Sequence, residues 1–263
     1  MSVFSSWADK AKGLEVLTLP ALEDNYIYVL VSGSNAMAID PADASTVLRL
    51  IKQRICKLTH VLVTHHHQDH IAGIGALQKA TGCHVVGPDD PRIKELDDHV
   101  GDGEKVEAGA WVLDVMSTPG HSHTHIAFHD QAHGLLWTGD TLFGAGCGRL
   151  FDCPPELMWN SLQKVARLPD TTQFFCGHEF TVDNLRFAAE VEPSNRDIKT
   201  RLEAAVAKRA AGQPTVPSTI GLEKQTNPFL RLRSPELRSK LGMPDASDLA
   251  VFTEMRRRKD SFQ

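Results

Sequence analysis

The sequence predicts an α+β protein in which a strand-rich half, residues 1–178, precedes a helical half, residues 179–263. Segments with alternating or β-branched apolar residues recur up to residue 176 and indicate strands. After residue 178 the apolar residues recur at helical spacing, with prolines between the segments. Groups that bind metals follow four of the strands. The length suits one large domain, or a core domain with a smaller one.

Composition is that of a soluble globular protein, with 41% hydrophobic and 23% charged residues. The net charge of −5 gives no electrostatic basis for nucleic acid or an anionic membrane as partner. No apolar run approaches the ~18–20 residues of a membrane span, and the N-terminus lacks a signal-peptide pattern. The five cysteines are scattered without a C-x-x-C motif, which is typical of free thiols. We expect a cytoplasmic monomer.

In the strand-rich half, periodicity and turn residues mark each element. The turn Ser-Gly-Ser-Asn at residues 32–35 predicts a hairpin. The predicted strands are residues 14–19, 26–31, 36–40, 59–64, 83–87, 111–116, 126–129, 135–138 and 173–176. The predicted helices are residues 42–52, 71–78 and 156–168. The polar stretch at residues 88–109 is expected to be irregular, with one short helix.

The helical half is predicted to hold four helices, at residues 184–190, 195–211, 235–241 and 247–259. A strand is expected here only at residues 229–232, where Phe-Leu-Arg-Leu alternates. We therefore place a domain boundary near residue 178.

The densest chemical signal is the run Thr-His-His-His-Gln-Asp-His at residues 64–70. Imidazole and carboxylate are the side chains that hold zinc, iron and manganese. The run lies between a predicted buried strand and a predicted helix, where a turn directs side chains towards one point at the end of a sheet. His66 would point away from its two neighbours on an extended segment, which favours a supporting role for it.

Three further candidates follow other strands, each beside glycine: His121, Asp140 and His178. One histidine at a strand end is more often structural than a ligand, but such recurrence argues against coincidence. Together with His65, His67, Asp69 and His70 of the run there are seven candidates, more than the four ligands of a structural zinc site. His123 and His125 could compete with His121; the Pro-Gly turn before His121 favours the latter.

The motifs His-x-His-x-Asp-His, Pro-Gly-His, Gly-Asp and Gly-His resemble the signature set of the metallo-β-lactamase superfamily, whose fold is a four-layer αββα sandwich. Further motifs narrow the resemblance to the glyoxalase II family, the hydroxyacylglutathione hydrolases. They are Asp-Asn-Tyr at 24–26, Thr-Gly-Asp-Thr at 138–141, Gly-Cys-Gly-Arg at 146–149, Gly-His-Glu-Phe-Thr at 177–181, Asn-Pro-Phe-Leu-Arg at 227–231 and Arg-Arg-Arg-Lys-Asp at 256–260.

The resemblance implies a site for two divalent metal ions. His65, His67 and His121 would hold one ion; Asp69, His70 and His178 would hold the other; Asp140 would bridge both. Asp69 and Asp140 would be catalytic as ligands that activate a metal-bridging hydroxide, since coordination brings the pKa of water from 15.7 to roughly 7. We expect zinc, with iron or manganese as alternatives that the same donors accept.

The implied reaction is hydrolysis of S-D-lactoylglutathione to D-lactate and glutathione, the second step of methylglyoxal detoxification. Residues 1–178 would form the catalytic domain and residues 179–263 a glutathione-binding domain. The implied contacts to this glutathione thioester are Arg149, Phe151, Phe180, Arg256 and Lys259. By sequence alone, the basic run at 256–259 also fits a solvated helix end favoured by the helix dipole.

The chain departs from many relatives at Phe151 and Phe180, where those relatives carry tyrosine. The hydroxyls that would hydrogen-bond to glutathione are missing, so we expect weaker binding of that substrate. Cys147 is interpreted as a packing residue, since the reaction needs no thiol nucleophile.

Four other functions fit the superfamily motifs. A persulfide dioxygenase would use one iron ion, but that group and the lactamases generally lack a long helical C-terminal region. A nucleic-acid processing enzyme is disfavoured by the acidic net charge. A metal-binding module without turnover would bind metal tightly and hydrolyse nothing.

Overall fold

The computed structural model describes residues 3–262. It divides the chain into two compact units. The first unit runs to Ser117 and includes Thr124–His133 and Trp137–Gly139. The second unit comprises Thr118–His123, Gly134–Leu136 and the chain from Asp140 onwards. The predicted site residues are shared between the two units.

The first unit contains a seven-stranded mixed sheet, with its strands in the order of the sequence. The strands are β1 (Phe4–Asp9), β2 (Leu14–Ala21), β3 (Asn25–Ser32), β4 (Asn35–Ile39), β5 (Lys57–Leu62), β6 (His84–Gly87) and β7 (Asp98–His99). Strands β1 to β4 pair antiparallel, and β4 to β7 pair parallel. Parallel pairing directs the carboxyl ends of β4 and β5 to one edge of the sheet.

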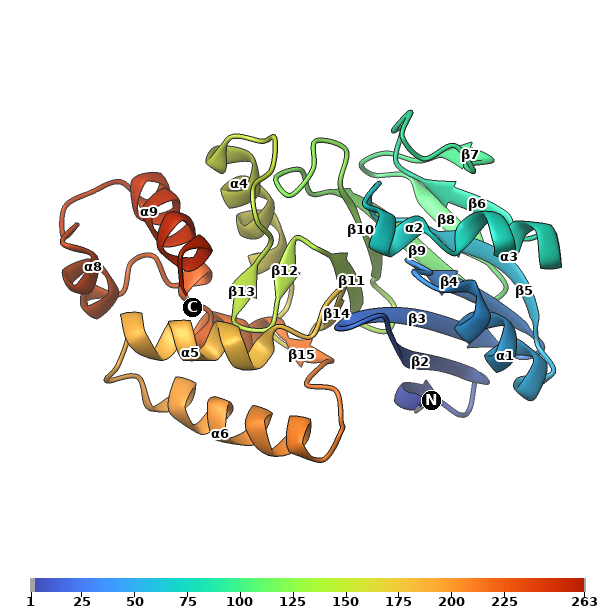
Figure 1. The fold of residues 1–263 in the computed structure, drawn as a ribbon, viewed down its shortest axis with the longest axis horizontal. Coiled ribbons are helices and arrows are strands. Elements are labelled where there is room, and N and C mark those ends of the chain that lie inside the picture. Colours follow the sequence, from blue (N-terminus) through green and yellow to red (C-terminus); the bar gives the residue numbers. More distant parts are fainter. Residues whose placement is uncertain (1–2, 263) are drawn as a thin grey trace. The chain divides into compact units, whose positions relative to one another are not determined.

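Three helices join these parallel strands: α1 (Ala44–Arg54), α2 (Gln68–Ile71) and α3 (Ile74–Thr81). Asp43 caps α1 by accepting hydrogen bonds from the backbone N–H groups of Ser45 and Thr46. Apolar residues of α1 and α3 are buried in one cluster with residues of β2 to β6, and the helices lie beside the sheet (Figure 1). The cluster includes Val47, Ile74 and Val61. This core fixes the edge at which the histidine run begins.

The first unit also contains an antiparallel meander of β8 (Lys105–Ala108), β9 (Trp111–Ser117) and β10 (Ile126–Asp130). The strand β11 (Leu135–Gly139) follows and crosses the division between the units. The loop after β9 and the end of β11 carry the predicted ligands His121 and Asp140.

Helices dominate the second unit. They are α4 (Pro155–Ala166), α5 (Thr181–Val191), α6 (Arg196–Ala210), α7 (Ile220–Thr226), α8 (Pro235–Leu241) and α9 (Asp248–Asp260). The short strands are β12 (Leu142–Phe143), β13 (Gly146–Cys147), β14 (Gln173–Cys176) and β15 (Ser218–Thr219). Strands β12 and β13 pair as a tight hairpin, and β14 pairs with β15.

Some predicted elements are wrong. The expected strand at 229–232 is a 3-10 turn, Pro228–Leu230, because Asn227 Oδ1 caps the backbone N–H of Phe229 and proline starts a turn. The stretch at 88–109 holds the strands β7 and β8 rather than a helix. The single helix expected at 71–78 is two helices, which meet at Gly73. Strand β1 and helix α7 lie where neither was predicted.

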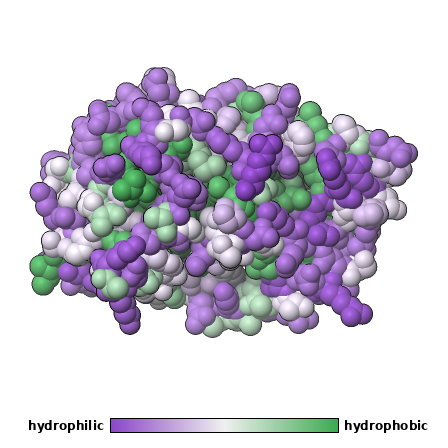
Figure 2. Space-filling model, turned by 180° about the vertical axis from the view of Figure 1, so that it is seen from behind, coloured by the Kyte–Doolittle hydropathy of each residue, from purple (hydrophilic) through white to green (hydrophobic). Residues whose placement is uncertain are grey.

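Within residues 3–262, no helix is both long and apolar enough to cross a membrane. On the face drawn in Figure 2, hydrophilic residues dominate, with hydrophobic residues in smaller patches among them.

Candidate metal centre

The histidine run follows β5 and enters α2 in the first unit, as predicted. His67 is the extended residue at the N-terminus of α2, and Asp69 and His70 lie on that helix. His65 and His70 are buried, while His67 and Asp69 are partly exposed. Two buried imidazoles thus lie beside two side chains that remain accessible.

Side-chain nitrogens and oxygens of the run lie close to one another. His65 Nε2 is 3.1 Å from His67 Nδ1. His70 Nε2 is 3.6 Å from Asp69 Oδ2. The predicted donors of the first unit are therefore arranged as two pairs, one of imidazoles and one of an imidazole with a carboxylate.

Asp40, which the sequence analysis did not select, holds this arrangement. It is buried, and its Oδ2 lies 3.0 Å from His70 Nδ1. The same carboxylate accepts hydrogen bonds from the backbone N–H of Thr64 at 2.8 Å and from its hydroxyl at 2.7 Å. A carboxylate at Nδ1 keeps the proton on that nitrogen and leaves the lone pair of Nε2 available to a metal. Asp40 therefore orients His70.

A glycine allows Asp40 and His70 to meet. A Cβ at Gly73 would lie 2.4 Å from the carbonyl oxygen of Pro41, so any other residue would push the α2–α3 junction away from the end of β4. The backbone N–H of Gly73 donates to that oxygen at 2.9 Å. This close approach joins the chain after β4 to the helix that carries His70.

Asn25 holds the other predicted ligand on α2. Its Nδ2 donates to the backbone oxygen of Asp69 at 3.0 Å and to Oδ2 of that residue at 3.1 Å. The sequence motif at 24–26 included this asparagine but gave it no role.

His66 interacts with a different acid. Its Nδ1 lies 3.6 Å from Asp90 Oδ2, and Asp90 also accepts hydrogen bonds from Arg92 and Thr124. Burial works against ionisation of Asp90, but these hydrogen bonds bring its pKa well below the usual value. The negative charge that faces His66 is therefore retained, in agreement with a supporting role for this histidine.

Three predicted ligands meet in the second unit. His121, Asp140 and His178 are all buried. His121 Nε2 and His178 Nε2 each lie 3.3 Å from the same oxygen, Oδ2 of Asp140. One carboxylate oxygen thus faces two imidazole nitrogens.

The proton on His121 is located by its other nitrogen. Nδ1 lies 3.0 Å from the backbone oxygen of Arg149, which can only accept, so Nδ1 is the donor. In the neutral ring, Nε2 then directs a lone pair at Oδ2 of Asp140. Two acceptors, Nε2 and Oδ2, therefore face each other. Such a contact is stable only with positive charge between the atoms, as a second proton or a metal ion supplies.

These separations fit a metal ion. Two ligand atoms that are each about 2.0–2.1 Å from one zinc ion, at a tetrahedral angle, lie about 3.3–3.4 Å apart. The two contacts to Asp140 have this separation, at 3.3 Å. Two imidazoles and a carboxylate are also a donor set that zinc, iron and manganese accept. The residues of the second unit therefore suit a divalent cation.

His123 and His125, the competitors of His121, lie elsewhere. The ring of His125 is buried and stacks on His65, with 4.8 Å between the ring centres. His123 is exposed and lies near Asp152 and Cys153. Within the second unit, His121 Nε2 lies 3.3 Å from Asp140 Oδ2.

The two predicted substrate-binding phenylalanines pack on imidazoles of this unit. The Phe180 ring stacks on His178 at 4.8 Å, and the Phe151 ring meets the edge of His121 at 5.2 Å between ring centres. Phe151 is 65% exposed, so most of its ring is open to a ligand.

The three predicted cations differ in accessibility. The Arg149 side chain is 68% exposed. Arg256 is buried and donates to the backbone oxygen of Cys147 at 2.9 Å and to Asp260 at 2.8 Å. The ammonium of Lys259 lies over the rings of Phe187 and Phe262. Burial, and then the charge of Arg256, lower the pKa of Lys259.

Cys147 is buried, and burial raises the pKa of its thiol to about 11 despite the nearby charge of Arg256. The thiol is therefore protonated at neutral pH and is a poor nucleophile, which supports its interpretation as a packing residue.

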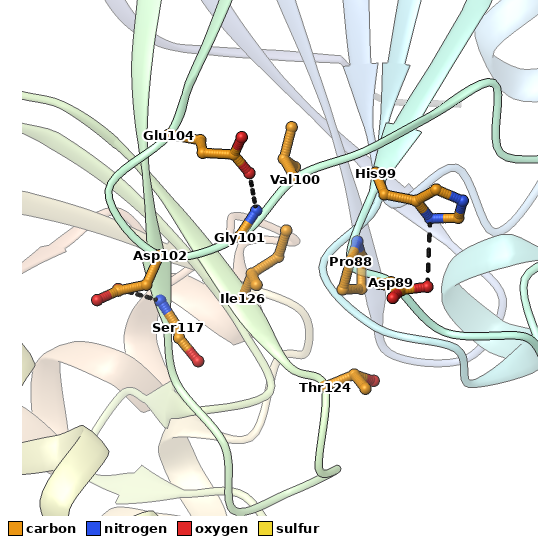
Figure 3. Close-up of a pocket in the computed structure, with 10 residues that line it drawn as sticks. All are labelled: Pro88, Asp89, His99, Val100, Gly101, Asp102, Glu104, Ser117, Thr124 and Ile126. Carbon is orange, nitrogen blue, oxygen red and sulfur yellow. Dashed lines mark hydrogen bonds and ion pairs between the residues drawn. The ribbon is translucent and has the colours of Figure 1, made fainter.

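A pocket of about 370 Å³ in the first unit contains none of the predicted site residues. Its acidic side chains point to local partners: Glu104 accepts from the backbone N–H of Gly101, and Asp102 from that of Ser117 (Figure 3). This pocket is therefore not part of the predicted metal site.

Comparison with known proteins identifies the fold first. Residues 22–178 match the metallo-beta-lactamase superfamily. The solved structure of the BLEG-1 B3 metallo-beta-lactamase has a TM-score of 0.62 at 22% identity, over 83% of this chain and 99% of that one. The structure of TTHA1623 in a di-iron-bound form has a TM-score of 0.58 at 25% identity, over 81% of this chain and 98% of that one. The predicted metallo-β-lactamase fold is confirmed.

The C-terminal region identifies the family. Residues 179–262 match the family described as "Hydroxyacylglutathione hydrolase C-terminus". The hydroxyacylglutathione hydrolase of Methylococcus capsulatus (strain Bath) is 47% identical over 254 residues, which cover 95% of this chain and 99% of the relative. The chain belongs to the hydroxyacylglutathione hydrolase (glyoxalase II) family of the metallo-β-lactamase superfamily.

Proposed function

We propose that this chain hydrolyses the thioester of S-(2-hydroxyacyl)glutathione, with S-D-lactoylglutathione as substrate and D-lactate and glutathione as products. The observation that carries the proposal is the similarity to hydroxyacylglutathione hydrolases over nearly the whole chain, the C-terminal region included. The reaction would be the second step of methylglyoxal detoxification.

The proposed metal centre takes His65, His67, Asp69 and His70 from the first unit and His121, Asp140 and His178 from the second. It would hold two divalent ions, zinc by preference, with Asp140 shared between them. Bound ions would lower the pKa of water and polarise the thioester carbonyl. The donor pairs in the first unit, and the two 3.3 Å contacts to Asp140 in the second, support this assignment.

The chain's own residues would fix the donors before substrate arrives. Asp40 holds the proton of His70 on Nδ1, and the backbone oxygen of Arg149 does the same for His121. Asn25 restrains the carboxylate of Asp69. Each ligand then presents its lone pair without reorganisation, which favours charge development in the transition state.

Glutathione carries two carboxylates, so its site needs cations. Arg149 has an exposed guanidinium, and Lys259 holds an ammonium on α9, where Arg256 is already bonded to Cys147 and Asp260. We assign glutathione binding to these three cations and to the rings of Phe151 and Phe180. Arg149 and Lys259 have the greater freedom to meet a carboxylate.

Replacing Lys259 with alanine should raise KM about tenfold, the effect of one lost charge-assisted hydrogen bond, while kcat and metal content change little. The pKa of Lys259 is lowered, so the ammonium loses its proton as pH increases, before the pH reaches the ordinary lysine range. The wild-type KM should therefore rise with pH over that interval. Steady-state kinetics across pH measure both effects. Arg257→Ala is the control, since Arg257 is on the same helix but exposed and paired with Glu254. An unchanged KM in Lys259→Ala would remove this residue from the site.

Phe180→Tyr should lower KM by roughly two- to tenfold, because the new hydroxyl can make one hydrogen bond of about 0.5–1.5 kcal/mol to glutathione. The ring already stacks on His178, so the substitution adds a donor without moving the aromatic plane. KM for S-D-lactoylglutathione, with metal content measured on the same sample, gives the result. A KM that stays the same or rises contradicts the proposed place of Phe180.

The function itself is tested by steady-state hydrolysis of S-D-lactoylglutathione, with metals counted on the same preparation. Turnover with about two metals per chain is expected. Two bound metals without turnover would overturn the substrate assignment, and other thioesters would be assayed. One bound iron ion without turnover would instead favour the persulfide dioxygenase function. An oxygen-uptake assay would test that function.

A further inference from the structure

Buried side chains from the helices hold the turn after Asp140. It is the hairpin of β12 and β13, residues 142–147, named here the 142–147 hairpin. Its turn contains Ala145 at φ 57°, a left-handed conformation that is unfavourable for alanine without support. The hairpin is buried, so its backbone groups require partners inside the protein.

Side chains from three helical segments provide these partners. Asn184 on α5 donates to the oxygen of Gly144 at 3.0 Å. Asn227, directly after α7, donates to the oxygen of Gly146 at 3.0 Å. Arg256 on α9 donates to the oxygen of Cys147 at 2.9 Å.

Glu223 on α7 is the acceptor at the centre of this arrangement and is fully buried. Its Oε2 accepts from the backbone N–H of Ala145 at 2.7 Å and from Asn227 Nδ2 at 3.1 Å. Its Oε1 accepts from Arg201 and Ser218. Four donors thus surround one carboxylate, and one of them is the strained residue of the turn.

The hairpin in turn reaches the metal ligands. A Cβ at Gly148 would lie 2.1 Å from the backbone oxygen of Asp140 and 3.0 Å from His121 Nδ1, so only glycine allows this approach. The next residue, Arg149, accepts the hydrogen bond that fixes the proton of His121. A displacement of the hairpin would therefore move the group that orients His121.

We propose that Glu223 is a positioning residue for the metal centre: it fixes the 142–147 hairpin, and through it the Arg149 carbonyl that orients His121 towards Asp140. The inference rests on the proposed function, because it takes His121 and Asp140 as ligands. It assigns the helical region a second task beside substrate binding, namely to hold the chain that follows Asp140.

The test variant is Glu223→Gln, which keeps the side-chain shape but replaces one acceptor oxygen with an amide that donates. In either orientation, the amide NH₂ group faces groups that are themselves donors. Hydrogen bonds that the carboxylate accepted are therefore lost. The matched control is Glu192→Gln. Glu192 is also buried in the second unit and paired with an arginine, Arg231, but this partner lies outside the hairpin. Both variants lose a buried Glu–Arg pair.

Holoenzyme of each protein is challenged with a chelator. Metal release, kcat, KM and Tm are measured, together with the ligand-field spectrum of the cobalt-substituted protein. We expect both variants to have a lower Tm than the wild type. Only Glu223→Gln should release metal faster, by about tenfold. It should also lower kcat with a smaller change in KM, and it should change the cobalt spectrum. Asn184→Leu, which removes one donor, serves as a milder variant if Glu223→Gln does not fold, with a smaller change in the same direction.

Equal metal release and kcat in the two glutamine variants at similar Tm would overturn the inference, since a merely structural role predicts that result. A folded Glu223→Gln with wild-type metal release would overturn it as well. If the wild type itself fails to hydrolyse S-D-lactoylglutathione, the proposed function fails. The chelator and spectroscopic results still decide the role of Glu223.

Discussion

Asp140→Ala is expected to lose both metal ions and at least about a thousandfold in kcat/KM. A single oxygen of this carboxylate lies 3.3 Å from Nε2 of His121 and 3.3 Å from Nε2 of His178. If Asp140 bridges two ions as proposed, its removal takes one ligand from each ion and also the negative charge that offsets their positive charge. The loss of metal-assisted catalysis costs several kcal/mol, which is on the order of a thousandfold in rate. Metal analysis and steady-state kinetics on one preparation measure both quantities.

The control for Asp140→Ala is Asp130→Ala in the first unit. Asp130 is equally buried and also contacts a histidine, His133, at 2.7 Å. That substitution should lower stability but leave both metals bound. Asp140→Asn, which keeps the side-chain volume, is the second variant if alanine does not fold. Metal stoichiometry that stays at the wild-type value in either Asp140 variant would refute the bridging role.

The second prediction concerns Asp40→Asn, for which we expect metal affinity and kcat to fall by about 10- to 100-fold. Asp40 Oδ2 accepts from His70, and Oδ1 accepts from the backbone N–H of Thr64. An asparagine has one oxygen, so its amide must face one of these donors. If the amide faces His70, the ring moves its proton to Nε2 and can no longer bind metal through that atom.

The backbone makes Asp40→Asn a clean substitution. Asp40 has φ 50°, a left-handed conformation that asparagine also tolerates. The matched control is Asp43→Asn, the same exchange three residues on, where asparagine caps α1 as well as aspartate does. Competition with a chelator gives the metal affinity, and NMR of the imidazole N–H groups gives the tautomer of His70. Wild-type affinity in Asp40→Asn would show that this carboxylate does not orient the ligand.

Most of the secondary structure of the first unit could be predicted from the sequence. Strands such as β3 and β5 are runs of β-branched and apolar residues, and this local pattern survives in any fold that buries them. One error, in the second unit, arises where a side-chain hydrogen bond overrides the pattern. Asn227 turns the backbone of Phe229 into a 3-10 turn by a hydrogen bond that no periodicity reveals.

The candidate metal ligands were also predicted from the sequence, because each lies in a short motif after a strand. The structure pairs them within each unit: His65 with His67, Asp69 with His70, and Asp140 with both His121 and His178. The family followed from motifs spread over both halves of the chain, and the comparisons confirm it.

By itself, the sequence determined the chemistry of this protein: the donor types, their number and the strand ends that carry them. Only the tertiary structure decided what holds those donors in place. Asp40 is 30 residues from His70, and Glu223 is 78 residues from Ala145. His121 is oriented by a backbone carbonyl, a group that every residue has. Such partners leave no local signal, because packing between distant segments selects them.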